Sequence, residues 1–322
     1  MNIANLSLAN PIILAPMAGI TDLPYRRIMK EFGAALVFSE MISANGVVRN
    51  GRKSFELTRS SADERPLAIQ IFGDEPAIIA ETARLLEERA ELIDINCGCP
   101  VNKVVRSGAG SALLREPARI GRIVAAVRKA IRVPLTIKIR SGWDQATLNY
   151  LEVGKIAAAE GADAITLHPR TRSQGFGGKA DWRQIALLQE AVDIPVIGSG
   201  DIFTACDAEQ MLSETGCAAI MIGRGGYGNP WLISNILRRR LKQPEQVPNC
   251  AERREVALRH LQYHEECFGA KKTVFEMRKH LCWYSRGMGG SSEFRQKVNQ
   301  QQTLTELRQI TRDFYSELAG HD

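Results

Sequence analysis

The sequence predicts an α/β protein, a (β/α)8 TIM barrel followed by a small C-terminal α-helical bundle. Eight short apolar runs recur over about 240 residues, which matches such a barrel in count and length. The segments between these runs carry helix signals, and only helical periodicity follows the last of them. An open doubly wound sheet is the main alternative, but eight units is a natural number for closure.

The strand candidates are nearly continuous apolar runs, and few of them alternate between apolar and polar residues. This pattern is typical of parallel strands that are covered on both faces. In chain order they are residues 11–15, 36–40, 67–72, 92–96, 135–139, 164–168, 195–198 and 218–222.

Helix signals lie between these strands. Pro76, shortly after Asp74, begins one helix, and Pro117 begins another. The second helix has one apolar face, formed by Ile120, Ile123, Val124, Val127 and Ile131. Thr204 and Asp207 have the spacing of a capping box ahead of a further helix.

The pattern changes at residues 238–248, RRRLKQPEQVP, which have the composition of a domain linker. Beyond it, residues 252–268 and 273–286 are predicted helices. A third apolar stripe has steps of three and four residues and consists of Leu304, Leu307, Ile310, Phe314 and Leu318. We therefore expect a catalytic barrel over residues 1–242 and a helical domain over residues 243–322.

Composition excludes several classes of protein. With 44% hydrophobic and 24% charged residues, the 322-residue chain is not disordered as a whole. It has no apolar run of about 18 residues, and its first 16 residues lack the basic start of a signal peptide. Seven scattered cysteines indicate a reduced, cytoplasmic protein. The net charge of +6 is compatible with a polyanionic partner but does not identify one.

Polar residues follow the apolar runs repeatedly, and in a barrel the strand ends and the loops after them carry function. Gly200 and Gly223 allow close approach of the backbone to an anion, and Arg224 can add a charged contact. Barrels often bind phosphate between the loops after the seventh and eighth strands. These residues therefore predict a phosphate-bearing ligand without identifying it.

Lys138 and Gln70 narrow the choice of ligand. A lysine that projects among apolar neighbours can be a Schiff-base nucleophile or a cation beside the electron-rich edge of a reduced flavin. Gln70 has donors and acceptors that suit the pyrimidine edge of a flavin, and the turn Pro16-Met17-Ala18 can lie against its ring. From Lys138 alone, the aldolase and flavin hypotheses are equally supported.

Cys99 lies between Gly98 and Pro100 in a turn that ends a strand. It can be a nucleophile, a general acid or an inert core residue. The pair Cys97 and Cys99 is not expected to bind a metal, because no second Cys/His pair with zinc spacing follows. Strand alternation points Cys97 away from Cys99, so we expect it to pack in the core.

Five segments together resemble the tRNA-dihydrouridine synthase family, most closely its bacterial B-type branch. They are APMAGITDLPYR, NCGCPVNKVVRSGAGSALL, KIRSGWD, HPRTRSQGFGGKADW and GRGGYGNPW, in that order along the chain. The resemblance covers essentially the whole chain, including the helical tail. One position departs from the family, which commonly has Asn-Gly-Asp where this chain has Ser199-Gly200-Asp201.

The resemblance implies an FMN-dependent oxidoreductase that reduces the C5=C6 bond of a D-loop uridine in tRNA with NADPH. Hydride would pass from N5 of FMN to C6, and Cys99 would be the catalytic acid that protonates C5. The implied cofactor-binding residues are Pro16, Met17, Ala18, Gln70, Lys138, His168, Ser199, Gly200, Asp201, Gly223 and Arg224.

Asn96 matches the position at which the family contacts the target uracil. Lys103, Arg140 and Arg170 are expected in loops at the barrel mouth, where they suit the phosphates of tRNA. We expect a monomer with no metal and no membrane partner. The alternatives are an FMN barrel acting on a small molecule, like a dihydroorotate dehydrogenase or an ene-reductase, and a tRNA-binding protein without enzymatic activity.

Overall fold

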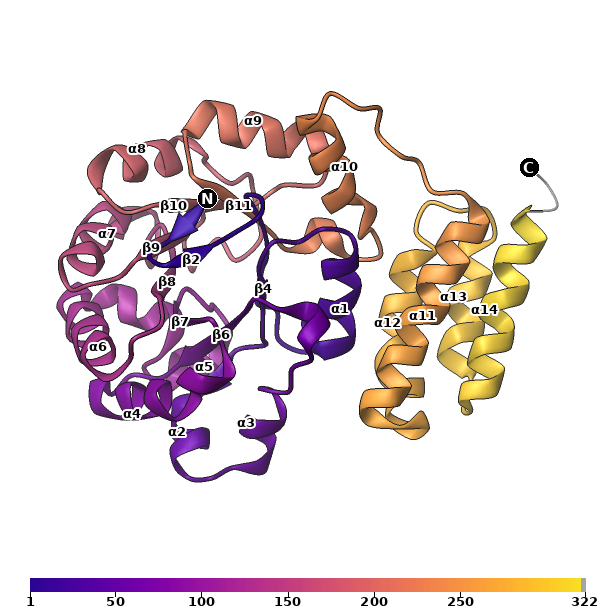
Figure 1. Cartoon of the computed structure of the whole chain (residues 1–322), viewed down its shortest axis with the longest axis horizontal. Coiled ribbons are helices and arrows are strands. Elements are labelled where there is room, and N and C mark those ends of the chain that lie inside the picture. The colour runs from indigo at the N-terminus through magenta and orange to yellow at the C-terminus, as the bar shows by residue number, and fades with distance from the viewer. Residues whose placement is uncertain (320–322) are drawn as a thin grey trace.

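A ring of parallel strands forms the centre of the computed structural model, which describes residues 1–319 (Figure 1). The ring closes between its first two strands through a parallel bridge of Ile13 with Leu36. A short additional strand pairs with β6. In spatial order the strands are β3 (Ile12–Leu14), β11 (Ala219–Ile222), β10 (Val196–Ser199), β9 (Ala164–His168), β8 (Leu135–Arg140), β7 (Leu92–Cys97), β6 (Leu67–Phe72) and β4 (Val37–Phe38), with β5 (Ile42–Ser43) beside β6. The predicted barrel is therefore confirmed.

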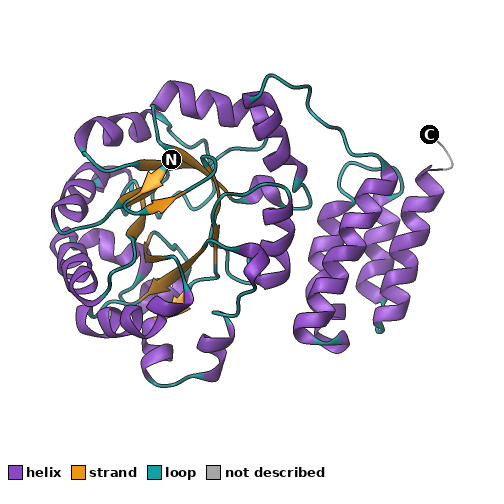
Figure 2. Cartoon of the chain, viewed as in Figure 1, coloured by secondary structure: helices purple, strands orange, loops and turns teal. Residues whose placement is uncertain are grey.

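Helices surround this ring (Figure 2). They are α1 (Leu23–Glu31), α2 (Ala44–Val48), α3 (Arg52–Glu56), α4 (Pro76–Leu86), α5 (Asn102–Arg106), α6 (Pro117–Ala130), α7 (Tyr150–Ala159), α8 (Arg183–Ala191), α9 (Ala205–Thr215) and α10 (Trp231–Arg240). Short 3-10 helices are η1 (Ala62–Glu64), η2 (Glu87–Arg89), η3 (Gly110–Arg115), η4 (Gln145–Thr147) and η5 (Arg224–Gly226). The capping box expected at Thr204 and Asp207 begins α9. No helix within residues 1–319 combines the length and apolarity needed to cross a bilayer.

Alternation along each strand decides which side chains face the barrel axis. In β7, Ile93, Ile95 and Cys97 belong to the apolar layer between the strands and the surrounding helices. Leu92 belongs to a separate cluster inside the barrel, so Asp94 and Asn96 share its inward face. The burial of Cys97 in the outer layer confirms its predicted packing role.

A short antiparallel hairpin precedes the barrel and was not predicted. Its strands are β1 (Asn2–Ile3) and β2 (Leu6–Ser7), joined by a turn in which Ala4 has a φ of 48°. Ile3 and, after the hairpin, Leu8 are buried in the same cluster as Leu92. The N-terminal segment therefore covers the end of the barrel at which the strands begin.

The C-terminal part consists of four helices packed side by side next to α1 and α10 (Figure 1). They are α11 (Cys250–Phe268), α12 (Ala270–Tyr284), α13 (Ser291–Gln300) and α14 (Leu304–Ala319). The helical bundle is as expected, but α13 was not predicted, because only Phe294 and Val298 of its residues are buried. The expected linker was too long at its start, since residues 238–240 still belong to α10. The boundary expected after residue 242 falls in the segment between α10 and α11.

Stacked aromatic rings join the two parts of the chain. Tyr227, in the loop after β11, stacks on Trp283 of α12 with 4.3 Å between ring centroids. The neighbouring Gly228 lies so close to the backbone of Trp283 that a Cβ atom would come within 2.3 Å of its carbonyl carbon. The helical domain therefore packs directly against a loop at the carboxyl end of the barrel.

Candidate active site

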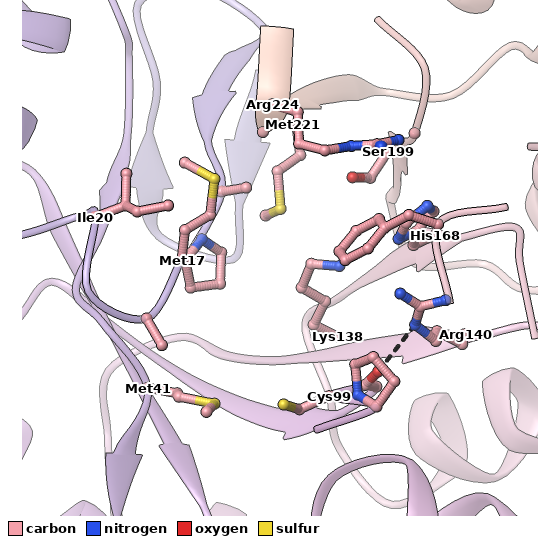
Figure 3. A pocket seen from close by; sticks show the side chains of 18 of the residues that line it. Met17, Ile20, Met41, Cys99, Lys138, Arg140, His168, Ser199, Met221 and Arg224 are labelled. Atoms are coloured by element: carbon pink, nitrogen blue, oxygen red, sulfur yellow. Dashed lines mark hydrogen bonds between the residues drawn. The ribbon is translucent and has the colours of Figure 1, made fainter. Parts of the chain in front are cut away.

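A cavity of about 320 Å³ lies at the carboxyl ends of the strands (Figure 3). Its size is at the lower end of the range for small-molecule sites. All the predicted catalytic, cofactor-binding and substrate-binding residues line it except Lys103 and Arg170. The lining ones are Pro16, Met17, Ala18, Gln70, Asn96, Cys99, Lys138, Arg140, His168, Ser199, Gly200, Asp201, Gly223 and Arg224. Tertiary structure thus brings together residues from every part of the barrel sequence, and their individual roles stay predictions.

A chain of hydrogen bonds inside the barrel leads to the turn of Cys99. Thr136 Oγ1 and Gln70 Nε2 donate to the two carboxylate oxygens of Asp94, at 2.6 and 2.7 Å. Asn96 Nδ2 donates to Gln70 Oε1 at 2.8 Å. Asn96 Oδ1 then accepts from the backbone N–H groups of Gly98 and Cys99, at 3.1 and 2.8 Å. The orientation of the Gln70 and Asn96 amides is therefore fixed. One end of this series of hydrogen bonds is a carboxylate, which accepts, and the other end is a pair of backbone N–H groups, which donate.

Asp94 was not among the predicted site residues. Its sequence signal is an acidic residue inside the apolar run LIDIN, two positions before Asn96 and hence on the same face. Burial raises the pKa of Asp94 to about 7, against hydrogen bonds from Thr136 and Gln70 that lower it. Met41, Phe176 and Phe203 also line the cavity, and none of them carries a distinctive sequence signal.

The substitution Asn96→Asp tests the orientation of these hydrogen-bonded amides. The new carboxylate would place an acceptor oxygen next to Gln70 Oε1, which is also an acceptor. If the Gln70 amide flipped, its Oε1 would instead face the carboxylate of Asp94. We expect the free energy of unfolding to fall by about 2–4 kcal/mol near pH 8. Either Asp94 or the new carboxyl at position 96 must keep a proton to form the hydrogen bonds, so the pKa of that carboxyl is raised. The loss in the free energy of unfolding should therefore shrink as the pH falls towards 5.

Denaturant unfolding at several pH values measures this difference. Asn102→Asp is the control, since Asn102 is an exposed amide at the start of α5. An Asn96→Asp protein as stable as the wild type at pH 8 contradicts the fixed orientation.

Lys138 places an ammonium group in the cavity without a partner. Within residues 1–319, no hydrogen bond or ion pair of its Nζ is found, and Figure 3 shows the side chain reaching into the cavity from β8. Burial, followed by the charge of Arg140, lowers the pKa of Lys138 to about 8. An unpaired, half-buried cation of this kind favours an anionic or electron-rich ligand.

His168 is neutral and has a defined tautomer. Burial, followed by the charges of Lys138 and three arginines, lowers its pKa well below the usual value. Its Nε2 lies 3.2 Å from Arg170 Nη1, and a guanidinium can only donate, so Nε2 accepts. The neutral imidazole therefore has its proton on Nδ1 and is a donor there.

The thiol of Cys99 is held in a rigid turn. Ser111 donates to the Cys99 carbonyl from both its backbone N–H and its hydroxyl, at 3.1 and 2.9 Å. Gly110 packs so closely that a Cβ atom would come within 2.9 Å of the same carbonyl oxygen. Burial raises the pKa of the Cys99 thiol, so it stays protonated at neutral pH. Such a thiol is a proton donor in its resting state.

The loops after β10 and β11 form the cationic side of the cavity. Gly200 has a φ of +114°, and a Cβ atom there would come within 2.9 Å of the His168 ring. Asp201 accepts from Arg170 Nη2 at 2.7 Å and from Arg224 Nη2 at 3.2 Å. Asp201 therefore positions two arginines, while the remaining donors of Arg224 are available to an anion.

The expectation that Arg140 lies in a loop at the mouth is wrong, and Arg170 lies in a loop but is buried. Arg140 is the last residue of β8 and only 3% exposed, and it donates to the carbonyls of Gly98, Thr171 and Gly175. Arg170 is 2% exposed and is bound to Asp201 and two loop carbonyls. Both guanidiniums tie the loops of the cavity together, because a buried cation requires internal acceptors. Lys103 lies outside the cavity, exposed on α5.

Comparison with known proteins gives consistent matches over the whole chain. The family model described as "Dihydrouridine synthase (Dus)" matches residues 13–319. A protein of Rickettsia bellii named probable tRNA-dihydrouridine synthase is 40% identical over 326 residues, covering 100% of both chains. Proteins named tRNA-dihydrouridine synthase B are 43% identical in Pasteurella multocida, covering 93% of this chain and 91% of the relative, and 38% identical in Pseudomonas aeruginosa, covering 98% and 96%.

Proposed function

The chain belongs to the dihydrouridine synthase family, and on that premise we propose that it reduces a D-loop uridine of tRNA to dihydrouridine, with FMN as cofactor and NADPH as reductant. One observation carries the chemical part of this proposal. The cavity combines an unpartnered ammonium, a chain of oriented amides and a protonated thiol. These groups suit a reaction in which the substrate accepts a hydride and a proton.

The cavity residues fit a flavin mononucleotide. Lys138, without a partner in the described part of the chain, suits the electron-rich edge of the ring. Gly223 leaves open space, since a Cβ atom there would have no neighbour closer than 3.8 Å, and Arg224 can contact a phosphate. Pro16, Met17 and Ala18 would lie along the ring. Flavin, when bound, supplies the hydride for C6 of uracil.

The protein's own groups account for the remaining proton. Cys99 would protonate C5 as the hydride adds to C6, so the ring gains two hydrogens and the thiolate recovers its proton from solvent. Asn96 lines the cavity beside Cys99 and would contact the uracil. The target base must leave its stack to reach the cavity, which requires binding energy from the rest of the tRNA.

An extended tRNA surface is available around the cavity. Lys103 and Arg106 are exposed on α5, next to the turn of Cys99. On the other side, Lys279 of α12 donates to the carbonyl of Gly19, in the loop that follows β3. The helical domain thus adjoins the cavity rim, which supports a role in tRNA binding. An enzyme that acts on tRNA is expected in the cytoplasm, and we retain a monomer as our expectation.

Lys103→Ala tests the charged surface. We expect weaker tRNA binding and a salt dependence whose slope, log Kd against log salt, is smaller by about one unit, because one phosphate contact is lost. Lys155→Ala, on the exposed face of α7, should change neither quantity. Binding titrations at several salt concentrations measure both, and identical slopes for the two variants would remove Lys103 from the interface.

The proposed function itself is tested by mass spectrometry of tRNA incubated with the protein, FMN and NADPH. The expected product is tRNA in which a D-loop uridine has gained two hydrogens. If a complete tRNA pool from cells lacking this activity remains unchanged while NADPH is still oxidised, a small-molecule substrate is the better assignment.

A further inference from the structure

Three metal-ligating side chains from three different helices meet where the helical domain packs against the barrel. They are Asp22, the N-cap of α1, His264 of α11 and Glu276 of α12. His264 Nε2 lies 3.1 Å from Glu276 Oε2 and 3.5 Å from Asp22 Oδ2. The three ligand atoms all lie within 4.8 Å of one another. This cluster is separate from the cavity, and the proposed reaction does not use it.

The hydrogen bond that His264 Nδ1 makes with Thr273 identifies Nε2 as an acceptor. The hydroxyl of Thr273 donates to the carbonyl of Gly269 at 2.9 Å. Its single hydrogen is thereby used, so Thr273 Oγ1 accepts from His264 Nδ1 at 2.9 Å. A neutral imidazole with its proton on Nδ1 turns the lone pair of Nε2 towards the two carboxylates.

The lone pair of His264 Nε2 and one oxygen of each carboxylate therefore lie within 4.8 Å of one another. The His264 side chain is fully buried, and the side chains of Asp22 and Glu276 are 12% and 40% exposed. A cation bound among these three acceptor atoms would interact favourably with each of them. A histidine whose second nitrogen is held by a neighbouring hydrogen bond is also the usual arrangement of a metal ligand.

The two distances from His264 Nε2 to the carboxylate oxygens suit a small tetrahedral ion. Zinc bound to nitrogen and oxygen at about 2.0–2.1 Å implies ligand atoms about 3.3 Å apart. The two distances from His264 Nε2, 3.1 and 3.5 Å, bracket that value. Asp22 Oδ1 accepts from the backbone N–H of Tyr25 at 2.9 Å, so its other oxygen is presented to the site by the helix cap.

Neighbouring charges leave the site open to a cation. Lys279 lies near Asp22, but its ammonium donates to the carbonyl of Gly19. Lys272 lies 3.7 Å from the other carboxylate oxygen of Glu276, and Glu40 adds negative charge near Asp22. Arg26 also lies near Asp22, but it is ion-paired with Glu64. The two ligand carboxylates and Glu40 thus face Lys272, Lys279 and a guanidinium that already has a partner.

We propose that Asp22, His264 and Glu276 bind one divalent cation of the zinc type, which joins the barrel to the helical domain. One carboxylate comes from the barrel, and the other two ligands come from the helical domain. The ion therefore has a structural role at the domain contact. This inference does not depend on the flavin or on tRNA.

Cobalt(II) and zinc(II) titrations of the full chain, after treatment with a chelator, test the site. We expect one ion per chain, at least tenfold weaker binding in Glu276→Gln, and unchanged binding in Glu266→Gln, a similarly exposed glutamate on α11. Asp22→Asn keeps the helix cap and should also weaken binding. Loss of the ion should lower the melting temperature of the wild type but not of Glu276→Gln.

The cobalt spectrum distinguishes this site from the free cysteines, of which Cys267 is the nearest in chain to His264. Bands of a tetrahedral nitrogen and oxygen site without thiolate charge transfer support the proposal. Equal affinity in the wild type and Glu276→Gln, or a thiolate spectrum alone, overturns it. So does nitrogen NMR of the zinc-treated protein that shows a proton on His264 Nε2.

Discussion

Replacing Cys99 by alanine is expected to abolish formation of dihydrouridine while leaving the flavin bound and reducible by NADPH. The thiol is the only proposed proton donor to C5, and loss of a general acid typically costs 10²–10⁴-fold in rate. Its side chain lines the cavity without an ion pair among the described residues, so its removal leaves the cofactor contacts intact. In this variant, reduction of the flavin by NADPH should therefore remain while reduction of uridine is lost.

Stopped-flow reduction by NADPH and mass spectrometry of tRNA measure the two half-reactions independently. Cys206→Ala, an exposed cysteine on α9, is the control and should behave as the wild type in both. Because burial raises the pKa of Cys99, the wild type should keep its acid form at moderately alkaline pH. Normal product formation by Cys99→Ala would refute the assignment of Cys99 as the acid.

Lys138→Met is expected to stabilise the ligand-free protein and to impair its activity. Lys138 is half-buried, its ammonium has no partner among residues 1–319, and desolvation lowers its pKa to about 8. An apolar side chain of similar length removes this desolvation cost, so the free energy of unfolding at pH 7 should rise by about 1–3 kcal/mol. The rate of uridine reduction should fall on the order of 10²-fold, because one preorganised charge is lost.

The pH dependence gives the stability part of this prediction a definite sign. Below pH 8 Lys138 is protonated in both the folded and unfolded chains, so the full penalty applies to the wild type. As the pH rises from 8 towards 10.5, the folded wild type releases the proton first and gains stability, and the advantage of Lys138→Met should shrink.

Lys30→Met is the matched control for Lys138→Met. Burial lowers the pKa of Lys30 as well, but its ammonium donates to the carbonyl of Ala35 at 3.1 Å. Its replacement should therefore not stabilise the chain, since a hydrogen bond is lost with the charge. Denaturant unfolding of both variants at pH 7 to 10 decides between the two cases. A Lys138→Met protein less stable than the wild type at pH 7 contradicts an unpaired ammonium.

Local sequence pattern was sufficient for the barrel because each strand and helix repeats a period that its own residues carry. The same alternation located most of the cavity residues, since polar residues at strand ends share one end of a closed barrel. The hairpin β1–β2 and α13 were missed. Each contains too few buried residues to show a period, and their stability comes from contacts with distant segments.

The sequence by itself determined the order of strands, the helical tail, the family and the set of residues around the cavity. Tertiary structure alone decided how those residues are paired. It gave Arg140 and Arg170, which were expected to suit tRNA phosphates at the mouth, internal hydrogen-bond partners instead. It joined Asp94 to the turn of Cys99 through the amides of Gln70 and Asn96. It also brought Asp22 to His264 across more than two hundred residues. The physical reason is that charge and hydrogen-bonding capacity are visible in a sequence, whereas burial and the partner available at 3 Å depend on how distant segments pack.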